Sequence, residues 1–184
     1  MRERTYKSEG IVLKRTNFGE ADKIVTIYSK HYGKVTVLAK GMRRMNSRKR
    51  GNLEVFNKVS FFAAKGKGMD IVTETEMLES FSYWKKELQK VAVAYQLCEM
   101  VDKLTVENSE QEEVYFLLSE YLKNLDSLDK AGNSNFLGSF GLSLLKILGF
   151  WPHDKPIPKN FRVSEFVEGI IEKELKAKNF LSRI

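Results

Sequence analysis

Cysteine and histidine are scarce in this 184-residue sequence. It contains one cysteine, Cys98, and two histidines, His31 and His153. A single cysteine excludes an intramolecular disulfide and a multi-cysteine zinc site. The only ligand-type neighbour of either histidine is Asp154, beside His153, a spacing that matches no common ligand set. We therefore expect no metal and no cofactor, and because Cys98 lies in a helical pattern we expect a buried structural thiol.

Long apolar runs are also absent. No segment approaches the roughly 18 consecutive apolar residues of a membrane span. The charged N-terminus is not followed by the apolar run of a signal peptide. We therefore expect a soluble, cytoplasmic protein without a membrane partner. The isoelectric point near 9.3 favours a nucleic acid as the polyanionic partner, with an anionic membrane surface as the second candidate.

The residue patterns of common enzymes are missing as well. Nucleases need clustered carboxylates for divalent metals, but Glu74 and Glu76 share one strand face without a third acid or a histidine. The Gly66-Lys67-Gly68 segment lacks the strand–glycine–helix context of a phosphate-binding loop, which predicts a hairpin turn. No Ser–His–acid or Cys–His arrangement is present. We predict a protein that is not an enzyme.

Positive charge is concentrated between residues 34 and 67. This window holds ten basic residues and one acid, Glu54, which gives a net charge of +9 against +7 for the whole chain. Such a block is typical of a segment that binds nucleic acid, because Lys and Arg neutralise phosphates and release counterions. The alternative is a solvated loop without a partner. The predicted nucleic-acid-binding residues are Lys34, Lys40, Arg43, Arg44, Arg48, Lys49 and Arg50, with Tyr32 as a base-stacking candidate.

The first half of the chain has the pattern of a small β-domain. Short β-branched and aromatic runs predict strands over 8–16, 21–29, 35–39, 55–64 and 69–78, with the basic segment between the third and fourth. A five-stranded barrel of this size is an OB-fold, and an SH3-like barrel is the structural alternative. Phe61 and Phe62 point to opposite faces of one strand, so at most one of them belongs to the core.

The second half has the pattern of a helical bundle. Apolar residues at spacings of three and four predict helices over 83–104, 136–148 and 164–178, and another that begins after a cap at Asn108 or Ser109. Residues 130–135 are predicted to end the second helix before the third begins.

The two halves also differ in charge. Residues 1–80 hold 17 basic and nine acidic residues, a net charge of +8, whereas the remainder holds 14 and 15, a net charge of −1. This asymmetry predicts a nucleic-acid-binding domain over 1–80 and a helical domain over 81–184. The predicted fold class is α+β, with an N-terminal five-stranded OB-fold barrel followed by a C-terminal α-helical bundle.

Several motifs of the first half occur together in a known order. They are Gly10-Ile11-Val12-Leu13, Gly19-Glu20-Ala21-Asp22-Lys23-Ile24, Gly33, Ala39-Lys40-Gly41-Met42-Arg43-Arg44, Ser47 and Gly51-Asn52-Leu53-Glu54-Val55-Phe56. In this order and spacing they resemble the N-terminal domain of the bacterial RecO family. The resemblance covers residues 5–80 and continues more loosely through 136–150.

The resemblance implies a role in DNA repair and recombination. RecO proteins have an OB-fold followed by a helical domain and act as mediators without catalytic turnover. They bind single- and double-stranded DNA, anneal complementary strands, and work with RecR and single-strand-binding protein to assist RecA loading at gaps. The resemblance therefore implies DNA contact first at Lys40, Arg43 and Arg44, and a cytoplasmic bacterial protein that is nucleoid-associated when bound to DNA.

The sequence departs from the family pattern in the second half. Many relatives carry a cysteine-rich zinc element after the Leu-Gly segment, but residues 146–154 contain no cysteine, so we expect that element to be absent. The chain is also short after Pro158. The resemblance implies that the acidic tail of single-strand-binding protein binds the helical domain, but the sequence identifies no residues for it. Two other functions stay open, a protein-interaction adaptor based on the helical bundle and an RNA-binding OB-fold protein.

Overall fold

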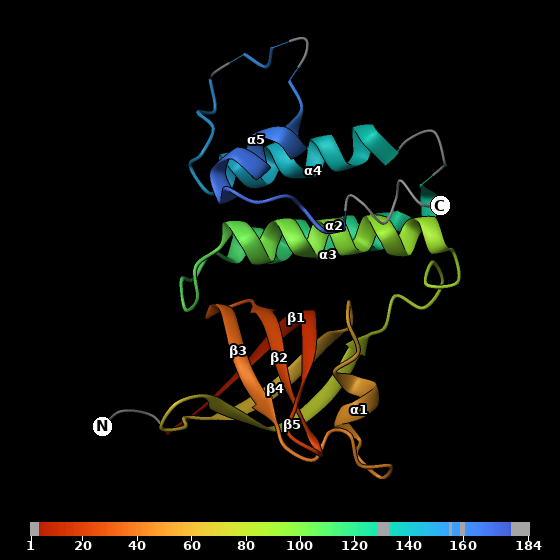
Figure 1. Ribbon diagram of the computed structural model, residues 1–184, viewed down its shortest axis with the longest axis vertical. Helices are drawn as coiled ribbons and strands as arrows, with labels where there is room; N and C mark the ends of the chain where they lie inside the picture. Colours follow the sequence, from red (N-terminus) through yellow and green to blue (C-terminus); the bar gives the residue numbers. More distant parts are fainter. Residues whose placement is uncertain (1–3, 129–132, 155, 159–160, 178–184) are drawn as a thin grey trace. The chain divides into compact units, whose positions relative to one another are not determined.

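The computed structural model describes residues 4–128, 133–154, 156–158 and 161–177 (Figure 1). The chain divides into two compact units. Residues up to 80 together with 106–115 form the first, here called the barrel unit. Residues 81–105 and those from 116 onward form the second, the helical unit.

Five strands close into a barrel in the first unit. They are β1 (Thr5–Phe18), β2 (Asp22–Ser29), β3 (Gly33–Ala39), β4 (Lys58–Ala64) and β5 (Asp70–Glu79). The barrel order is β1-β2-β3-β5-β4, with antiparallel pairs except for a short parallel contact between β3 and β5. This is the predicted five-stranded OB-fold, so the SH3-like alternative is set aside.

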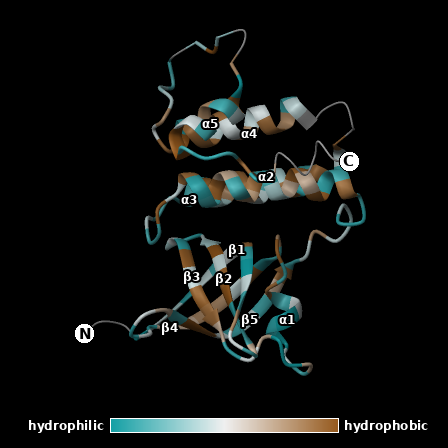
Figure 2. Cartoon of the chain, in the orientation of Figure 1, coloured by the Kyte–Doolittle hydropathy of each residue, from teal (hydrophilic) through white to brown (hydrophobic). Residues whose placement is uncertain are grey.

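The inward positions of these strands form the core of the barrel. Buried side chains alternate with half-buried ones along β4 and the second half of β3, as the two-residue period of a strand requires. Brown apolar segments mark β2 and β3 in Figure 2. Phe61 is 1% exposed, whereas Phe62 is only half-buried, which confirms that one of the pair belongs to the core. Gly66-Lys67-Gly68 lies in the turn between β4 and β5, as predicted.

The connection from β3 to β4 differs from the prediction. The fourth strand begins at Lys58 and not at Val55, because Phe56 has a φ of 76° and the Asn57 N–H donates to the Glu54 carbonyl in a turn. A short helix, α1 (Lys49–Asn52), lies inside the basic segment and was not predicted.

The segment from 106 to 115 completes the barrel unit. The Asn108 N–H donates to the Lys34 carbonyl of β3 at 2.9 Å, and Glu107 forms a bridge beside it. The Tyr28 hydroxyl donates to the Gln111 carbonyl at 3.2 Å. These bonds hold the chain outside a helix as far as Gln111, so the predicted cap at Asn108 or Ser109 is wrong.

Helices make up the second half of the chain, which confirms the α+β class. They are α2 (Leu88–Leu104), α3 (Glu112–Asn124), α4 (Asn133–Ile147) and α5 (Val163–Ile171), with a 3₁₀ turn at Leu125–Ser127. Cys98 is buried in α2, as expected. In the described part of the chain, no helix is long and apolar enough to cross a membrane.

Helix boundaries depart from the prediction in three places. The first helix begins at Leu88 because Trp84 lies in a turn, where its indole N–H donates to the Leu122 carbonyl at 2.8 Å. Residues 130–132 of the predicted break lie outside the described residues, and 133–135 belong to α4. The last helix ends at Ile171 because Glu172 adopts a left-handed conformation, with a φ of 52°; residue 178 lies outside the described residues.

Candidate nucleic-acid interface

The basic loop, defined as residues 40–50, is fixed at both sides by buried apolar side chains. Met42 and Leu53 are fully buried and belong to the apolar core of the barrel. Each buried side chain of this size contributes roughly 1.5–3 kcal/mol from removal of apolar surface from water. The loop is therefore held against the barrel despite the repulsion among its cations.

Polar bonds tie the first part of the loop to the turn between β1 and β2. The Gly41 N–H donates to Asp22 Oδ1 at 2.7 Å, and the Arg43 N–H donates to the Ala21 carbonyl at 2.9 Å. Gly41 adopts the left-handed region with a φ of 67°, which glycine occupies without a steric cost. These bonds bring the cations of the loop beside the ends of β1 and β2.

The second part of the loop is tied to β5. The Lys49 ammonium donates to the Val72 carbonyl at 2.8 Å, and the Asn52 amide donates to the Thr75 carbonyl at 2.8 Å. Burial lowers the pKa of the Lys49 amine, while Asp22 opposes this effect. The charge of Lys49 is therefore directed toward the barrel, which makes it an anchor of the loop.

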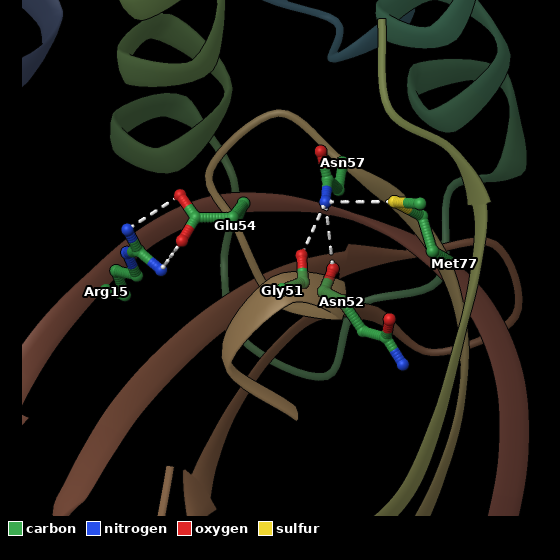
Figure 3. A network of polar contacts seen from close by, with 6 residues as sticks. All are labelled: Arg15, Gly51, Asn52, Glu54, Asn57 and Met77. Atoms are coloured by element: carbon green, nitrogen blue, oxygen red, sulfur yellow. Dashed lines mark hydrogen bonds and ion pairs between the residues drawn. The ribbon is translucent and has the colours of Figure 1, made fainter. Parts of the chain in front are cut away.

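A polar network closes the loop next to β4. The Asn57 amide donates to the carbonyls of Gly51 and Asn52 at 3.0 and 3.1 Å (Figure 3). Glu54, the acid of this window, forms a bidentate pair with Arg15, with both N–O distances at 2.7 Å (Figure 3). Because Arg15 neutralises Glu54, this carboxylate does not offset the positive charge of the loop.

Five cations of the loop extend into solvent. Their side chains are exposed, and they are Lys40, Arg43, Arg44, Arg48 and Arg50. Arg43 also donates to the Gly19 carbonyl at 3.2 Å, which orients its guanidinium over the β1–β2 turn. Within the described residues, none of the five pairs with a carboxylate. The arrangement is a rigidly anchored group of positive charges that is open to an anionic ligand.

Two further cations border this group and were missed by the sequence prediction. Burial lowers the pKa of the Lys23 amine, and the nearby charges of Arg15, Arg43 and Arg50 lower it further, while Glu54 opposes them. Lys23 and Arg15 lie on β2 and β1 near the turn that the loop contacts. A count of charges along the chain excluded them because they precede residue 34. The turn signal at residues 17–20, between the two predicted strands that carry Arg15 and Lys23, is the feature that could have added them.

Lys34 and Tyr32 lie away from the basic loop. In the β2–β3 hairpin, Lys23 pairs with Ala39 at the loop end and Ser29 pairs with Gly33 at the other. The seven residues of β3 separate the two ends by roughly 20 Å. Lys34 is 9% exposed, and Tyr32 is 36% exposed and contacts Tyr6. The structure therefore does not bring these two predicted residues together with the other six.

No candidate site for a metal ion or an activated thiol is present among the described residues. Within those ranges, no three side chains of His, Cys, Asp or Glu converge as metal ligands would. Burial raises the pKa of the Cys98 thiol, with a smaller contribution from Asp102. The side chains of Glu74 and Glu76 are exposed on β5.

Two family models together match most of the chain. The model described as recombination protein O, N terminal, matches residues 1–81, and the model described as recombination protein O, C terminal, matches residues 85–153. The chain belongs to the RecO family. The barrel and its basic loop thus lie in the part that corresponds to the N-terminal RecO model.

Curated relatives bear the name DNA repair protein RecO. The one from Pelotomaculum thermopropionicum is 33% identical over 148 residues, which are 80% of this chain and 56% of the relative. The one from Roseiflexus is 34% identical over 83% of this chain and 53% of the relative. The one from Thermoanaerobacter is 34% identical over 81% of this chain and 60% of the relative. This chain therefore spans between half and two thirds of the length of these RecO proteins.

Proposed function

We propose that this chain acts as a DNA-binding recombination mediator of the RecO type. It binds single- and double-stranded DNA through the basic loop, anneals complementary strands and, with RecR, assists RecA loading in gap repair. The observation that carries the proposal is the group of five exposed cations on a loop anchored to the barrel. The names of the relatives, which describe DNA repair, support it.

The proposed mechanism is electrostatic and requires no catalytic turnover. Lys and Arg side chains neutralise phosphates and release condensed counterions, which produces affinity with little sequence preference. Arg side chains also bind phosphate oxygens in bidentate geometry. The cations are held in position before DNA arrives, because the loop is fixed by Met42, Leu53 and Lys49. Less conformational entropy is then lost on binding than a mobile loop would lose.

The proposed contact residues follow from exposure. We assign phosphate contact to Lys40, Arg43, Arg44, Arg48 and Arg50, which are exposed. Half-buried Lys23 borders this group, and Arg15 beside it is already paired with Glu54. Lys49 supports the loop and Lys34 is buried, so neither belongs to the proposed contact surface. The proposed partners are DNA, RecR and the tail of single-strand-binding protein, and the proposed location is the bacterial cytoplasm, with the nucleoid when DNA is bound.

Charge reversal tests the proposal. Replacing Lys40, Arg43 and Arg44 by Glu is expected to weaken DNA binding strongly and to abolish strand annealing, measured by fluorescence anisotropy and by pairing of two labelled strands. The matched control reverses Lys86, Lys103 and Lys173, which are exposed in the helical unit. The total charge change is then the same. Normal annealing by the loop variant, or an equal loss in both variants, would contradict a role for the basic loop.

The nature of the polyanion needs a separate comparison. DNA and RNA strands of the same sequence are titrated in parallel with an acidic peptide that ends in apolar residues. The proposal predicts that DNA binds at least as tightly as RNA and that the loop variant binds both much more weakly than the wild type does. Tighter binding of RNA would favour an RNA-binding OB-fold protein. Binding of the peptide alone, unaffected by the loop variant, would favour an adaptor based on the helical unit.

A further inference from the structure

A second cluster of aromatic and basic side chains lies on the barrel unit, at the start of β1 and the β4–β5 hairpin. The rings of Tyr6 and Tyr32 contact each other with centroids 4.7 Å apart. The Lys65 ammonium lies 4.6 Å from the centroid of the Tyr6 ring. The backbone N–H of Lys65 donates to the Arg4 carbonyl at 2.9 Å, so Arg4, just before β1, and Lys65, just after β4, are neighbours. We call this group the hairpin surface.

Asp70 holds the cluster in position. Its carboxylate accepts hydrogen bonds from the Tyr6 hydroxyl at 3.0 Å and from the Lys65 ammonium at 3.1 Å. It also accepts the Gly66 N–H at 3.3 Å, which fixes the turn of the hairpin. Lys67, which lies in this turn, is counted with the hairpin surface. Arg4 and Lys67 are exposed, and neither pairs with a carboxylate among the described residues. The hairpin surface therefore keeps an excess of positive charge although it contains one acid.

Tyr32 provides an accessible ring at this surface. Its side chain is 36% exposed, whereas the Tyr6 ring beneath it is 6% exposed. The contact with Tyr6 restricts the orientation of the Tyr32 ring, so little freedom is lost when a base stacks on it. Aromatic rings beside cations are the features that bind single strands, because the ring stacks on unpaired bases and the cations contact phosphates. Paired bases in a duplex offer no such exposed face.

The hairpin surface is distinct from the basic loop. Tyr32 precedes β3 and the basic loop follows it, so the length of that strand separates them. In Figure 1 the tip of the β4–β5 hairpin lies to the left of the barrel, whereas α1 lies on its right. Tyr32 and the tip of the hairpin thus lie away from the basic loop within the same barrel unit.

We propose that the hairpin surface binds a second single strand of DNA while the basic loop holds the first. The inference rests on the proposed DNA-binding function and extends it, because annealing requires two strands to be brought together and two sites on one unit would do so. Two strands held on one unit have a high effective concentration toward each other. The basic loop supplies affinity, and Tyr32 exposes unpaired bases of the second strand for pairing.

Stoichiometry tests the second site directly. The full chain is titrated with a single strand of about eight nucleotides, within the range of lengths that an OB-fold binds, and the number of bound strands is measured by native mass spectrometry. We expect two strands on the wild type and one on a variant with Tyr32→Ala, Arg4→Glu and Lys67→Glu. The basic-loop variant is likewise expected to bind one. Tyr32→Phe is the matched control, since it keeps the stacking ring.

Annealing kinetics give an independent readout. At strand concentrations that saturate the basic loop, the hairpin variant is expected to anneal about tenfold more slowly, as loss of one stacked base and two phosphate contacts predicts, while Tyr32→Phe anneals normally. A hairpin variant that binds two strands or anneals at the wild-type rate would overturn the second site alone. A wild type that binds no strand would overturn the proposed function as well. Unchanged thermal unfolding checks that the variants are folded.

Discussion

At the scale of single residues, two adjacent cations of the basic loop have different roles. Arg48 is exposed and has no carboxylate partner among the described residues, whereas the Lys49 ammonium donates to the Val72 carbonyl of β5. A count of charges treats the two alike, because the direction of a side chain depends on the helix that α1 forms. The basic character of residues 40–50 was thus predictable from the sequence, but the division between contact and anchor was not.

The pair Arg48→Gln and Lys49→Gln separates these roles. Each variant loses one positive charge. Arg48→Gln is expected to reduce the salt dependence of single-strand binding by about 0.7 in log–log slope, the contribution of one phosphate contact, and to leave the unfolding midpoint unchanged. Lys49→Gln is expected to keep the slope and to lower the free energy of unfolding by about 1 kcal/mol, through the lost hydrogen bond. The reverse pattern would show that Lys49 contacts DNA.

At the scale of elements, local patterns predicted the strands better than the connections. Turn residues and β-branched runs placed all five strands of the barrel to within a few residues. The connection after β3 was predicted as a plain loop, because the burial of Met42 and Leu53 and the bonds to β5 depend on contacts distant in the sequence. The packing of residues 106–115 beside β3 could not be predicted from the sequence for the same reason.

Gly33 is the position where the 106–115 segment constrains β3 most tightly. Its φ is 61°, and an added Cβ would clash with the Ser109 carbonyl. Gly33→Ala is expected to lower the free energy of unfolding by more than about 2 kcal/mol, which exceeds the cost of the left-handed backbone alone. Gly19→Ala is the matched control, because Gly19 has a φ of 56° and open space around its Cβ position. Denaturant unfolding measures both; equal losses would contradict the close approach of Ser109.

At the scale of the whole molecule, positive charge and buried tyrosines both gather in the barrel unit. Residues 1–80 carry a net charge of +8 and the remainder −1, and this asymmetry, visible in the sequence, matches the exposed cations described above. The count of charges did not include Arg15 and Lys23, because their proximity to the loop depends on the bonds that Gly41 and Arg43 make to the β1–β2 turn. Burial also raises the pKa of Tyr6, Tyr28 and Tyr115 above the ordinary value of 10.0.

The tyrosines predict a loss of stability in alkali. Their pKa is higher in the folded than in the unfolded state, so the unfolded state ionises first. Stability is complete below pH 10 and falls as the pH rises above it. Tyr28→Phe is expected to reduce this fall, because burial alone raises the pKa of Tyr28. The lowered pKa values of Lys23 and Lys49 make stability rise with pH instead. The variant and the wild type share this effect, so it cancels when the two are compared. Parallel pH profiles of unfolding free energy would contradict the prediction.

The central claim is that the exposed cations of the basic loop bind DNA phosphates. The most direct test is the affinity of the full chain for a labelled single strand at several salt concentrations. Five phosphate contacts predict a slope of about −3.5 for log Kobs against log salt, and a shallower slope for the Lys40, Arg43 and Arg44 charge-reversal variant. A slope near zero, or no binding even at low salt, would contradict the claim.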